Sequence, residues 1–446
     1  MTSNSTISAL RHGNIPLVIV IAAIVVALSF DTSIVRLSPI IGEINHKLTA
    51  FIVITTVYAV GQYLILGLVR EKDIESRSKQ SLQIKLIHRT LIVVQSVLAT
   101  ICIFVILQLL TLSAYSSAML VAATAISYSL ATVMMAVLAK WFFSWFKSNR
   151  NNLVLMYGFS AASIAINTAI TLAFTVTVAA NIPAEILPRV ASVFQSPPQG
   201  SLSELFNNAY VVSSIASFFA TWIATAMFLR HHSQRIGKAI YWIIVSIPLA
   251  FFLSQFSTSF LDLLAPLQES DPLAFYALFT FIYLLSKSLG GILFGIAFFD
   301  VAKHMQHSTI KKYMVISACG FILFFVSNQA AATFIRISYP PFGIASISTI
   351  GLSSYLILVG IYSSVISASQ DVKLRKLIEK SVAEQSGLLK GLTKGQVEQE
   401  LQKRMTVITR NYSDKLTEET GISPSLTDYE VKQYMQEVLR EVRKVK

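Results

Sequence analysis

Lys287 is the first residue in this sequence whose chemistry stands out, because it lies in the middle of an apolar stretch. The stretch, residues 274–301, reads AFYALFTFIYLLSKSLGGILFGIAFFDV. A stretch of this length can cross a bilayer, and a charge at its centre costs roughly 2.5–3.5 kcal/mol on insertion scales. A neighbouring helix must therefore offer Lys287 a hydrogen-bond partner, water or a ligand.

Two amides, Gln62 and Asn167, are candidate partners of Lys287 because both are predicted near the middle of their own spans. Hydrogen bonds between helices explain most buried amides in membrane bundles. The carboxylates of Asp31 and Asp300 are predicted at span ends, too far along their helices to pair with Lys287. The sequence therefore predicts that Lys287 contacts amides and carbonyl groups, is neutral, or meets water or an anion in a cavity.

Gly291 and Gly295 form a small-xxx-small pair directly after Lys287. Residues without bulk at this spacing let two transmembrane helices approach closely. We expect these glycines to serve helix packing.

Metal-ligating residue types occur at the end of the same stretch. Asp300, His304 and His307 fall on one face of a helix, and a surface helix end or a weak metal site would both explain them. The sequence contains no HExxH, CxxC, P-loop or GxSxG pattern, so neither an enzyme nor a bound cofactor is expected. Cys102 and Cys319 lie in apolar runs and are predicted to be packing residues.

The composition is that of a membrane protein with a more polar C-terminal part. Of the 446 residues, 54% are hydrophobic and 13% are charged, whereas soluble domains carry about 25% charged residues. Residues 369–446 hold nearly half of the charged residues. The net charge of +13 is explained by basic loops on one side of a membrane. The lipid bilayer, not nucleic acid, is therefore the expected partner.

Apolar runs predict an all-α fold, a polytopic transmembrane helix bundle of about ten spans over residues 1–368. A small helical cytoplasmic tail follows over residues 369–446. The first span also resembles a signal peptide with a cleavage site near residues 27–29, although its length favours a retained span. The predicted spans are residues 15–34, 48–69, 90–112, 118–143, 153–180, 209–229, 239–260, 274–299, 313–334 and 344–367.

The distribution of lysine and arginine predicts the orientation of the bundle. Basic residues concentrate in alternate connections, at residues 1–14, 70–89, 144–152, 230–238 and 303–312. The opposite side carries Arg36, Lys47, Arg189 and Arg336. Because cytoplasmic loops are enriched in lysine and arginine, we expect a cell-membrane protein with both termini in the cytoplasm.

Helical patterns continue outside the spans. Residues 186–194 predict a short helix that rests on the membrane or closes over the bundle. Thr393 with Gln396 and Thr427 with Glu430 have the spacing of capping boxes, which predicts helix starts in the tail. Residues 427–445 carry a heptad seam that packs on the other tail helices, pairs with a second copy, or binds a cytoplasmic protein.

Three adjacent segments resemble a known family. They are Tyr339–Gly343 (YPPFG), the Gly- and Ser-rich Gly351–Ser369, and Gln370–Ser381 (QDVKLRKLIEKS). Together with the general layout, they are similar to a family of uncharacterised multipass membrane proteins from ammonia-oxidising archaea. The resemblance implies an archaeal cell membrane and implies no particular activity.

Three functions are compatible with these features. A last span that runs into a helical tail favours a membrane sensor or signal relay. Lys287 in a pathway would instead suit a transporter or channel. The lack of catalytic motifs also fits a structural membrane subunit.

Overall fold

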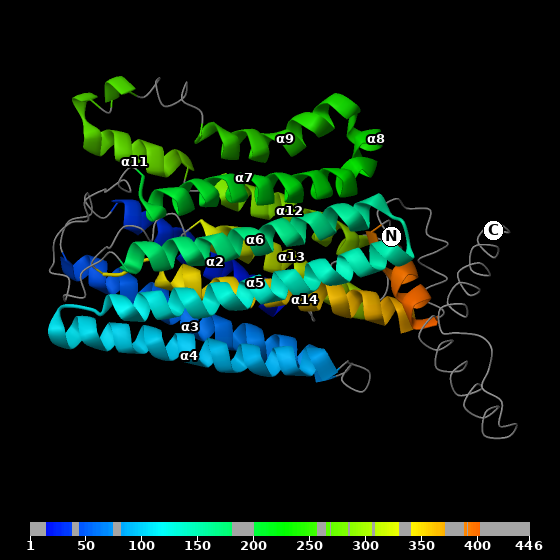
Figure 1. The fold of residues 1–446 in the computed structure, drawn as a ribbon, viewed down its shortest axis with the longest axis horizontal. Coiled ribbons are helices and arrows are strands. Elements are labelled where there is room, and N and C mark those ends of the chain that lie inside the picture. Colours follow the sequence, from blue (N-terminus) through cyan, green and yellow to red (C-terminus); the bar gives the residue numbers. More distant parts are fainter. Residues whose placement is uncertain are drawn as a thin grey trace, which may run out of the picture.

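A computed structural model gives the arrangement of the helices in Figure 1. It describes residues 15–37, 44–74, 82–180, 200–256, 265–267, 269–283, 286–305, 308–329, 340–370, 388–389 and 391–401. All the labelled elements in these ranges are helices. They are α2 (Ile15–Leu37), α3 (Ile44–Ile74), α4 (Leu82–Leu112), α5 (Ser117–Ser148), α6 (Asn152–Ala180), α7 (Leu202–Leu229), η2 (Arg230–His232), α8 (Ser233–Ile236), α9 (Lys238–Ser254), α11 (Pro272–Tyr283), α12 (Ser286–His304), α13 (Ser308–Asn328) and α14 (Ile344–Gln370).

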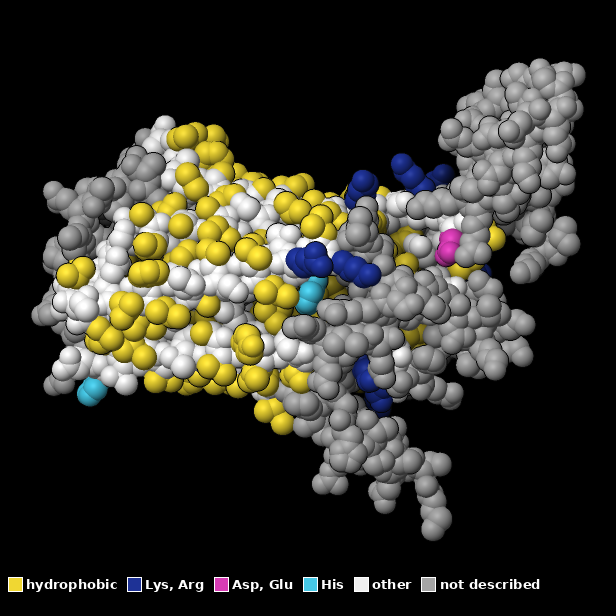
Figure 2. Space-filling model, turned by 90° about the horizontal axis from the view of Figure 1, so that it is seen from below, with side chains coloured by type: hydrophobic (Ala, Val, Ile, Leu, Met, Phe, Trp, Pro, Cys, Tyr) yellow, Lys and Arg dark blue, Asp and Glu magenta, His cyan; other side chains and the backbone are white. Residues whose placement is uncertain are grey.

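The all-helical, multipass character predicted from the sequence is confirmed. Eight described helices are long and apolar enough to cross a bilayer, and they run along the long axis of the bundle in Figure 1. Figure 2 shows apolar side chains spread over one flank, with lysine and arginine gathered toward one end. An apolar flank faces lipid at no cost, whereas basic side chains require the headgroup region. The chain is therefore a multi-pass membrane protein.

The predicted total of ten spans stays a prediction. The seventh predicted span corresponds to α9, a shorter apolar helix. The eighth is divided between α11 and α12, which pack against different helices, α11 against α2 and α12 against α13. Residues 284–285, between α11 and α12, lie outside the described residues, as do the predicted helices at 186–194 and 427–445.

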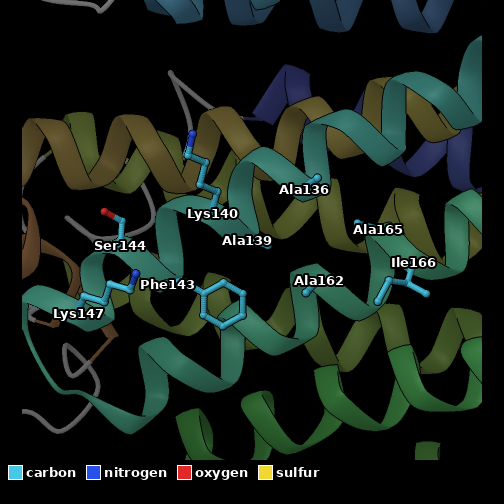
Figure 3. A pocket seen from close by; sticks show the side chains of 9 residues that line it. All are labelled: Ala136, Ala139, Lys140, Phe143, Ser144, Lys147, Ala162, Ala165 and Ile166. Carbon is cyan, nitrogen blue, oxygen red and sulfur yellow. The ribbon is translucent and has the colours of Figure 1, made fainter.

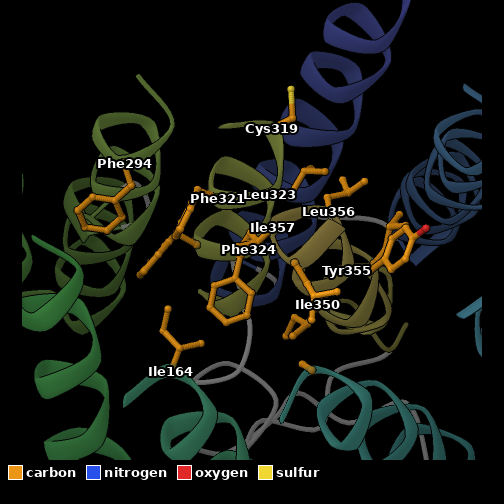
Figure 4. Packing of buried hydrophobic residues seen from close by; sticks show 14 of the residues in the cluster. Ile164, Phe294, Cys319, Phe321, Leu323, Phe324, Ile350, Tyr355, Leu356 and Ile357 are labelled. Carbon is orange, nitrogen blue, oxygen red and sulfur yellow. The ribbon is translucent and has the colours of Figure 1, made fainter. Parts of the chain in front are cut away.

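Helix α14 is the most deeply buried element of the bundle. It packs against α13, α5, α4, α3 and α2, and its whole apolar window is buried. Figure 4 shows Tyr355, Leu356 and Ile357 of α14 among the apolar side chains of its neighbours. Because lipid does not favour one helix over another, such packing depends on van der Waals contact and interhelical hydrogen bonds.

Small residues bring the backbones of α13 and α14 into contact. A Cβ atom placed on Gly360 would lie 2.7 Å from the Tyr313 carbonyl oxygen and 2.7 Å from the Ser317 amide nitrogen. A Cβ atom placed on Gly320 would lie 2.7 Å from the Ile357 amide nitrogen. These are backbone atoms, which cannot rotate away, so any larger side chain must separate the two helices.

The N-terminus of α14 is capped by a carboxylate from another helix. Asp31 of α2 is 1% exposed. Its Oδ1 accepts from the Gly343 amide at 2.8 Å, and its Oδ2 accepts from the Ser346 amide at 3.1 Å and the Ser346 hydroxyl at 2.8 Å. The first amides of a helix have no partner within the helix. A carboxylate there satisfies them and complements the positive end of the helix dipole.

One end of the bundle contains the turn between α5 and α6, with Asn149 and Asn151. We call it the basic end. This end comprises residues 140–157, 228–238 and 298–304 together with the tail segment 388–401, which lies beside the ends of α5 and α14 in Figure 1. Hydrogen bonds and ring contacts join these parts, including Asn149 to the Gly391 carbonyl and Tyr157 to Phe228 and Phe298. Asp31 and Gly343 lie at the opposite end of α14.

We predict that Gly360→Ala lowers the stability of the bundle by about 1–3 kcal/mol, the usual cost of overpacking a well-packed core. The physical reason is the contact of the new methyl group with two backbone atoms of α13. Thermal unfolding of the purified protein in detergent, followed by tryptophan fluorescence, measures the change. Gly67→Ala is the matched control, because a Cβ atom at Gly67 has no neighbour within 4 Å. Equal melting temperatures for the two variants would contradict the packing account.

Candidate functional site

Lys287, on the first turn of α12, is buried between helices with 6% of its surface exposed. Its ammonium nitrogen lies 3.2 Å from the Tyr210 hydroxyl of α7 and 5.3 Å from the centre of the same ring. The hydroxyl oxygen accepts one N–H, and the ring face adds a cation–π attraction. Lys287 therefore has a partner within the bundle, Tyr210, which is not one of the two amides predicted from the sequence.

The Tyr210 ring is held in place by its own neighbours. Phe174 of α6 stacks on it with ring centres 6.0 Å apart. One turn further along α7, the Ser213 hydroxyl donates to the Tyr210 carbonyl at 3.1 Å. The position of the hydroxyl that Lys287 contacts is therefore fixed by packing from α6 and α7.

Asn167 joins this site through Ser213 and does not contact Lys287 directly. Its amide nitrogen donates to the Ser213 hydroxyl at 3.0 Å, and its carbonyl oxygen accepts from the Asn328 amide at 3.4 Å. The Tyr128 hydroxyl donates to the Asn328 oxygen at 3.5 Å. A chain of buried polar groups thus crosses from α12 through α7, α6 and α13 to α5. We call these residues the polar chain.

Gln62, the other predicted partner, lies elsewhere. It is buried in α3, and its Oε1 atom has no hydrogen-bond partner in the part of the chain that the structure describes. Neighbouring Gly61 faces Ile24 of α2. Equal depth in the membrane brings two residues to one level, but only helix adjacency brings them together. Among the described residues, α3 packs mainly against α2, α14 and α4.

Gly291 and Gly295 pack against α13. A Cβ atom on Gly291 would lie 2.7 Å from Phe325 Cβ, and one on Gly295 would lie 2.9 Å from the Ala318 carbonyl oxygen. This close approach of α12 and α13 fixes the helix that carries Lys287.

Asp300 lies at the basic end beside two histidines that the sequence did not group with it. Its Oδ2 atom is 3.4 Å from His231 Nε2 and 3.3 Å from His232 Nε2. The sequence grouped Asp300 with His304 and His307. The side chains of these two histidines lie outside the described residues. The sequence signal for the observed pair is the doublet His231-His232 at the end of a span, but nothing in the sequence indicates which carboxylate faces it.

A groove of about 610 Å³ runs between α5 and α6. Figure 3 shows its alanines, among them Ala139 and Ala162, and the two lysines at one end, Lys140 and Lys147. The lack of bulk at the alanines produces the hollow. In a bilayer, an apolar hollow with basic residues at its rim faces lipid chains and headgroups.

The tail segment 388–401 docks on the end of α5. Gln396 accepts a hydrogen bond from Trp145 Nε1 at 2.9 Å, Gln399 donates to the Ser144 hydroxyl at 2.7 Å, and the Gly391 carbonyl accepts from Asn149 at 3.0 Å. A Cβ atom on Gly395 would lie 2.8 Å from the Trp145 carbonyl oxygen. The glycine therefore permits backbone contact between the tail and α5.

Comparisons with protein-family models, with curated proteins and with solved structures found no match to this chain. The resemblance at residues 339–381 therefore stays a prediction.

We predict that Tyr210→Phe lowers the melting temperature, whereas the same substitution in a Lys287→Met background has a much smaller effect. Removing the hydroxyl leaves a buried ammonium without its acceptor, which costs about 1–3 kcal/mol. Once the ammonium is gone, the hydroxyl has no cation to satisfy. The four variants form a double-mutant cycle that isolates the pair. Additive effects of the two substitutions would show that Tyr210 does not hold Lys287.

Proposed function

We propose that this protein is a membrane sensor or signal relay that couples its helix bundle to its C-terminal tail. The observation that carries the proposal is the docking of segment 388–401 on the end of α5 through the contacts of Ser144, Trp145 and Asn149. A tail held by side-chain hydrogen bonds and one close backbone contact can be docked or released by a small shift of α5. A relay requires such an element with two arrangements.

Helix α5 connects that docking site to the centre of the bundle. It is 32 residues long, or about 48 Å at 1.5 Å per residue. Nearer its other end, the Ser127 hydroxyl donates to the Ile347 carbonyl of α14 at 2.6 Å and accepts from the Gly351 amide at 3.2 Å. A helix is stiff along its axis, so a displacement of α14 at Ser127 is carried to Ser144.

The proposal places the basic end in the cytoplasm and the bundle in the cell membrane. The arrangement of lysine and arginine supports this orientation. The released tail, including residues 427–445, would then bind a cytoplasmic protein or a second copy of the chain.

A second candidate function is transport, and one observation favours it. The ammonium of Lys287 has three N–H donors, and among the described residues it contacts one acceptor, Tyr210. The remaining donors suit an anion or water in a pathway. A transporter would lose flux in proteoliposomes on Lys287→Met, whereas a relay would keep its tail coupling.

We predict that cysteines at positions 144 and 399, in a background where Cys102 and Cys319 are replaced by alanine, cross-link under mild oxidation while the tail is docked, because the side chains now at these positions meet. Asp31→Asn, which weakens the cap at the far end of α14, should change the rate of that cross-link by about fivefold or more, the lower range of coupling between linked sites. Ser346→Ala, which removes one donor to Asp31, should change it in the same direction by less. The rate is measured in proteoliposomes with a mild oxidant.

The matched control is Thr111→Val on the exposed face of α4, where the hydroxyl contacts the Leu107 carbonyl of its own helix. Its cross-linking rate should equal that of the parent. If Asp31→Asn and Ser346→Ala, both monodisperse, also cross-link at the parent rate, the bundle and the tail are not coupled and the relay proposal is wrong.

A further inference from the structure

His231, His232 and Asp300 place three metal-ligating atoms around one point at the basic end. The two histidines lie in η2, the turn that leads from α7 toward α9, and Asp300 lies near the end of α12. Their candidate ligand atoms all lie within 4.8 Å of one another. The His231 side chain is 9% exposed, that of Asp300 15% and that of His232 29%, so the cluster is partly buried and is open to solvent on the His232 side.

The hydrogen bond on the other side of the His231 ring determines what faces Asp300. Nδ1 of His231 lies 3.3 Å from the carbonyl oxygen of Phe228. A carbonyl oxygen only accepts, so Nδ1 carries the hydrogen, and in a neutral ring Nε2 presents a lone pair. That lone pair faces a carboxylate oxygen at 3.4 Å, and Nε2 is buried without a hydrogen-bond partner in the described structure. Two electron pairs in this position repel each other unless a cation lies between them.

The distances favour a metal ion over a proton. A charge-assisted hydrogen bond between imidazolium and carboxylate would bring nitrogen and oxygen to about 2.7–2.9 Å. Zn²⁺ holds nitrogen and oxygen ligands at about 2.0–2.2 Å in a tetrahedral arrangement, which sets neighbouring ligand atoms about 3.4 Å apart. The observed separations of 3.4 Å and 3.3 Å match the second value. An Nδ1–H bonded to a backbone carbonyl is also the usual outer contact of a metal-binding histidine.

We propose that His231, His232 and Asp300 form a binding site for a divalent transition-metal ion of the Zn²⁺ class. Two imidazoles and one carboxylate are ligands that suit Zn²⁺, and Co²⁺ accepts similar ligand sets. The ion would join the turn after α7 to α12. One coordination position is left for water or a further ligand.

Metal titration of the full-length protein, purified in detergent without a polyhistidine tag, tests the site. Co²⁺ is followed by its visible absorption and then displaced with Zn²⁺. The parent should bind one equivalent, and His231→Ala, His232→Ala and Asp300→Asn should each weaken binding by about tenfold or more, since even outer contacts of metal ligands change affinity by about 10–100-fold. His46→Ala, which removes an exposed histidine of α3, is the matched control and should bind like the parent.

Thermal unfolding supplies a second readout that does not depend on spectra. Zn²⁺ should raise the melting temperature of the parent and of His46→Ala, and at the same concentration should raise that of the conservative variant Asp300→Asn by less, because a ligand stabilises the folded state in proportion to how tightly that state binds it. Absence of saturable binding by the parent would overturn the proposal. Binding that is lost on His304→Ala or His307→Ala while His231→Ala keeps full affinity would also overturn it.

Discussion

The buried N-terminus of α14 is the constraint on which the arrangement of the bundle depends. The first amide groups of a helix have no partner within the helix, and because those of α14 are buried, another part of the protein must satisfy them. Asp31 supplies both carboxylate oxygens to the Gly343 and Ser346 amides and to the Ser346 hydroxyl. The cap fixes α2 against α14 and fixes the depth at which α14 starts.

From that cap, hydrogen bonds and close contacts follow α14 along its length. Ser127 of α5 hydrogen-bonds to the backbone of α14, and His88 of α4 lies 2.7 Å from the Tyr355 hydroxyl. At Gly360, the lack of a side chain lets the backbone of α13 come into contact with α14. The apolar exterior contributes little to this specificity, because lipid is as good a partner for leucine as another helix is. Polar and small residues therefore determine which helices are neighbours, and the apolar residues determine that they are helices in a membrane.

The two ends of the bundle differ in chemistry. At the basic end, rings of Trp145, Phe142, Tyr157 and Phe298 follow one another with centres 5.7–6.0 Å apart. This row extends from the docked tail to the last turns of α12, where Asp300 meets the histidine doublet. The tail and the proposed metal site thus share one packed cluster.

The sequence predicted the class of fold because apolar length and loop charge are local properties. Lys287 was identified by the same reasoning, since a charge inside an apolar run needs no alignment with other segments. Its partner Tyr210 could not be predicted, because adjacency of α7 and α12 depends on how the helices pack in three dimensions. The sequence placed Asp31 at a span end without indicating its partners, because the packing of α2 against α14 also depends on the three-dimensional arrangement. The sequence grouped Asp300 with His304 and His307, which are near it in the chain, instead of with His231 and His232.

Hydrogen–deuterium exchange measured by mass spectrometry tests the coupling of bundle and tail most directly, because coupling between two sites must act in both directions. Gly395→Leu would separate the tail from α5, since a Cβ atom there already meets the Trp145 carbonyl oxygen. The account predicts faster exchange in residues 388–401 and also at the amides of residues 343–347, at the opposite end of α14. Faster exchange in the tail with unchanged exchange at residues 343–347 would contradict it.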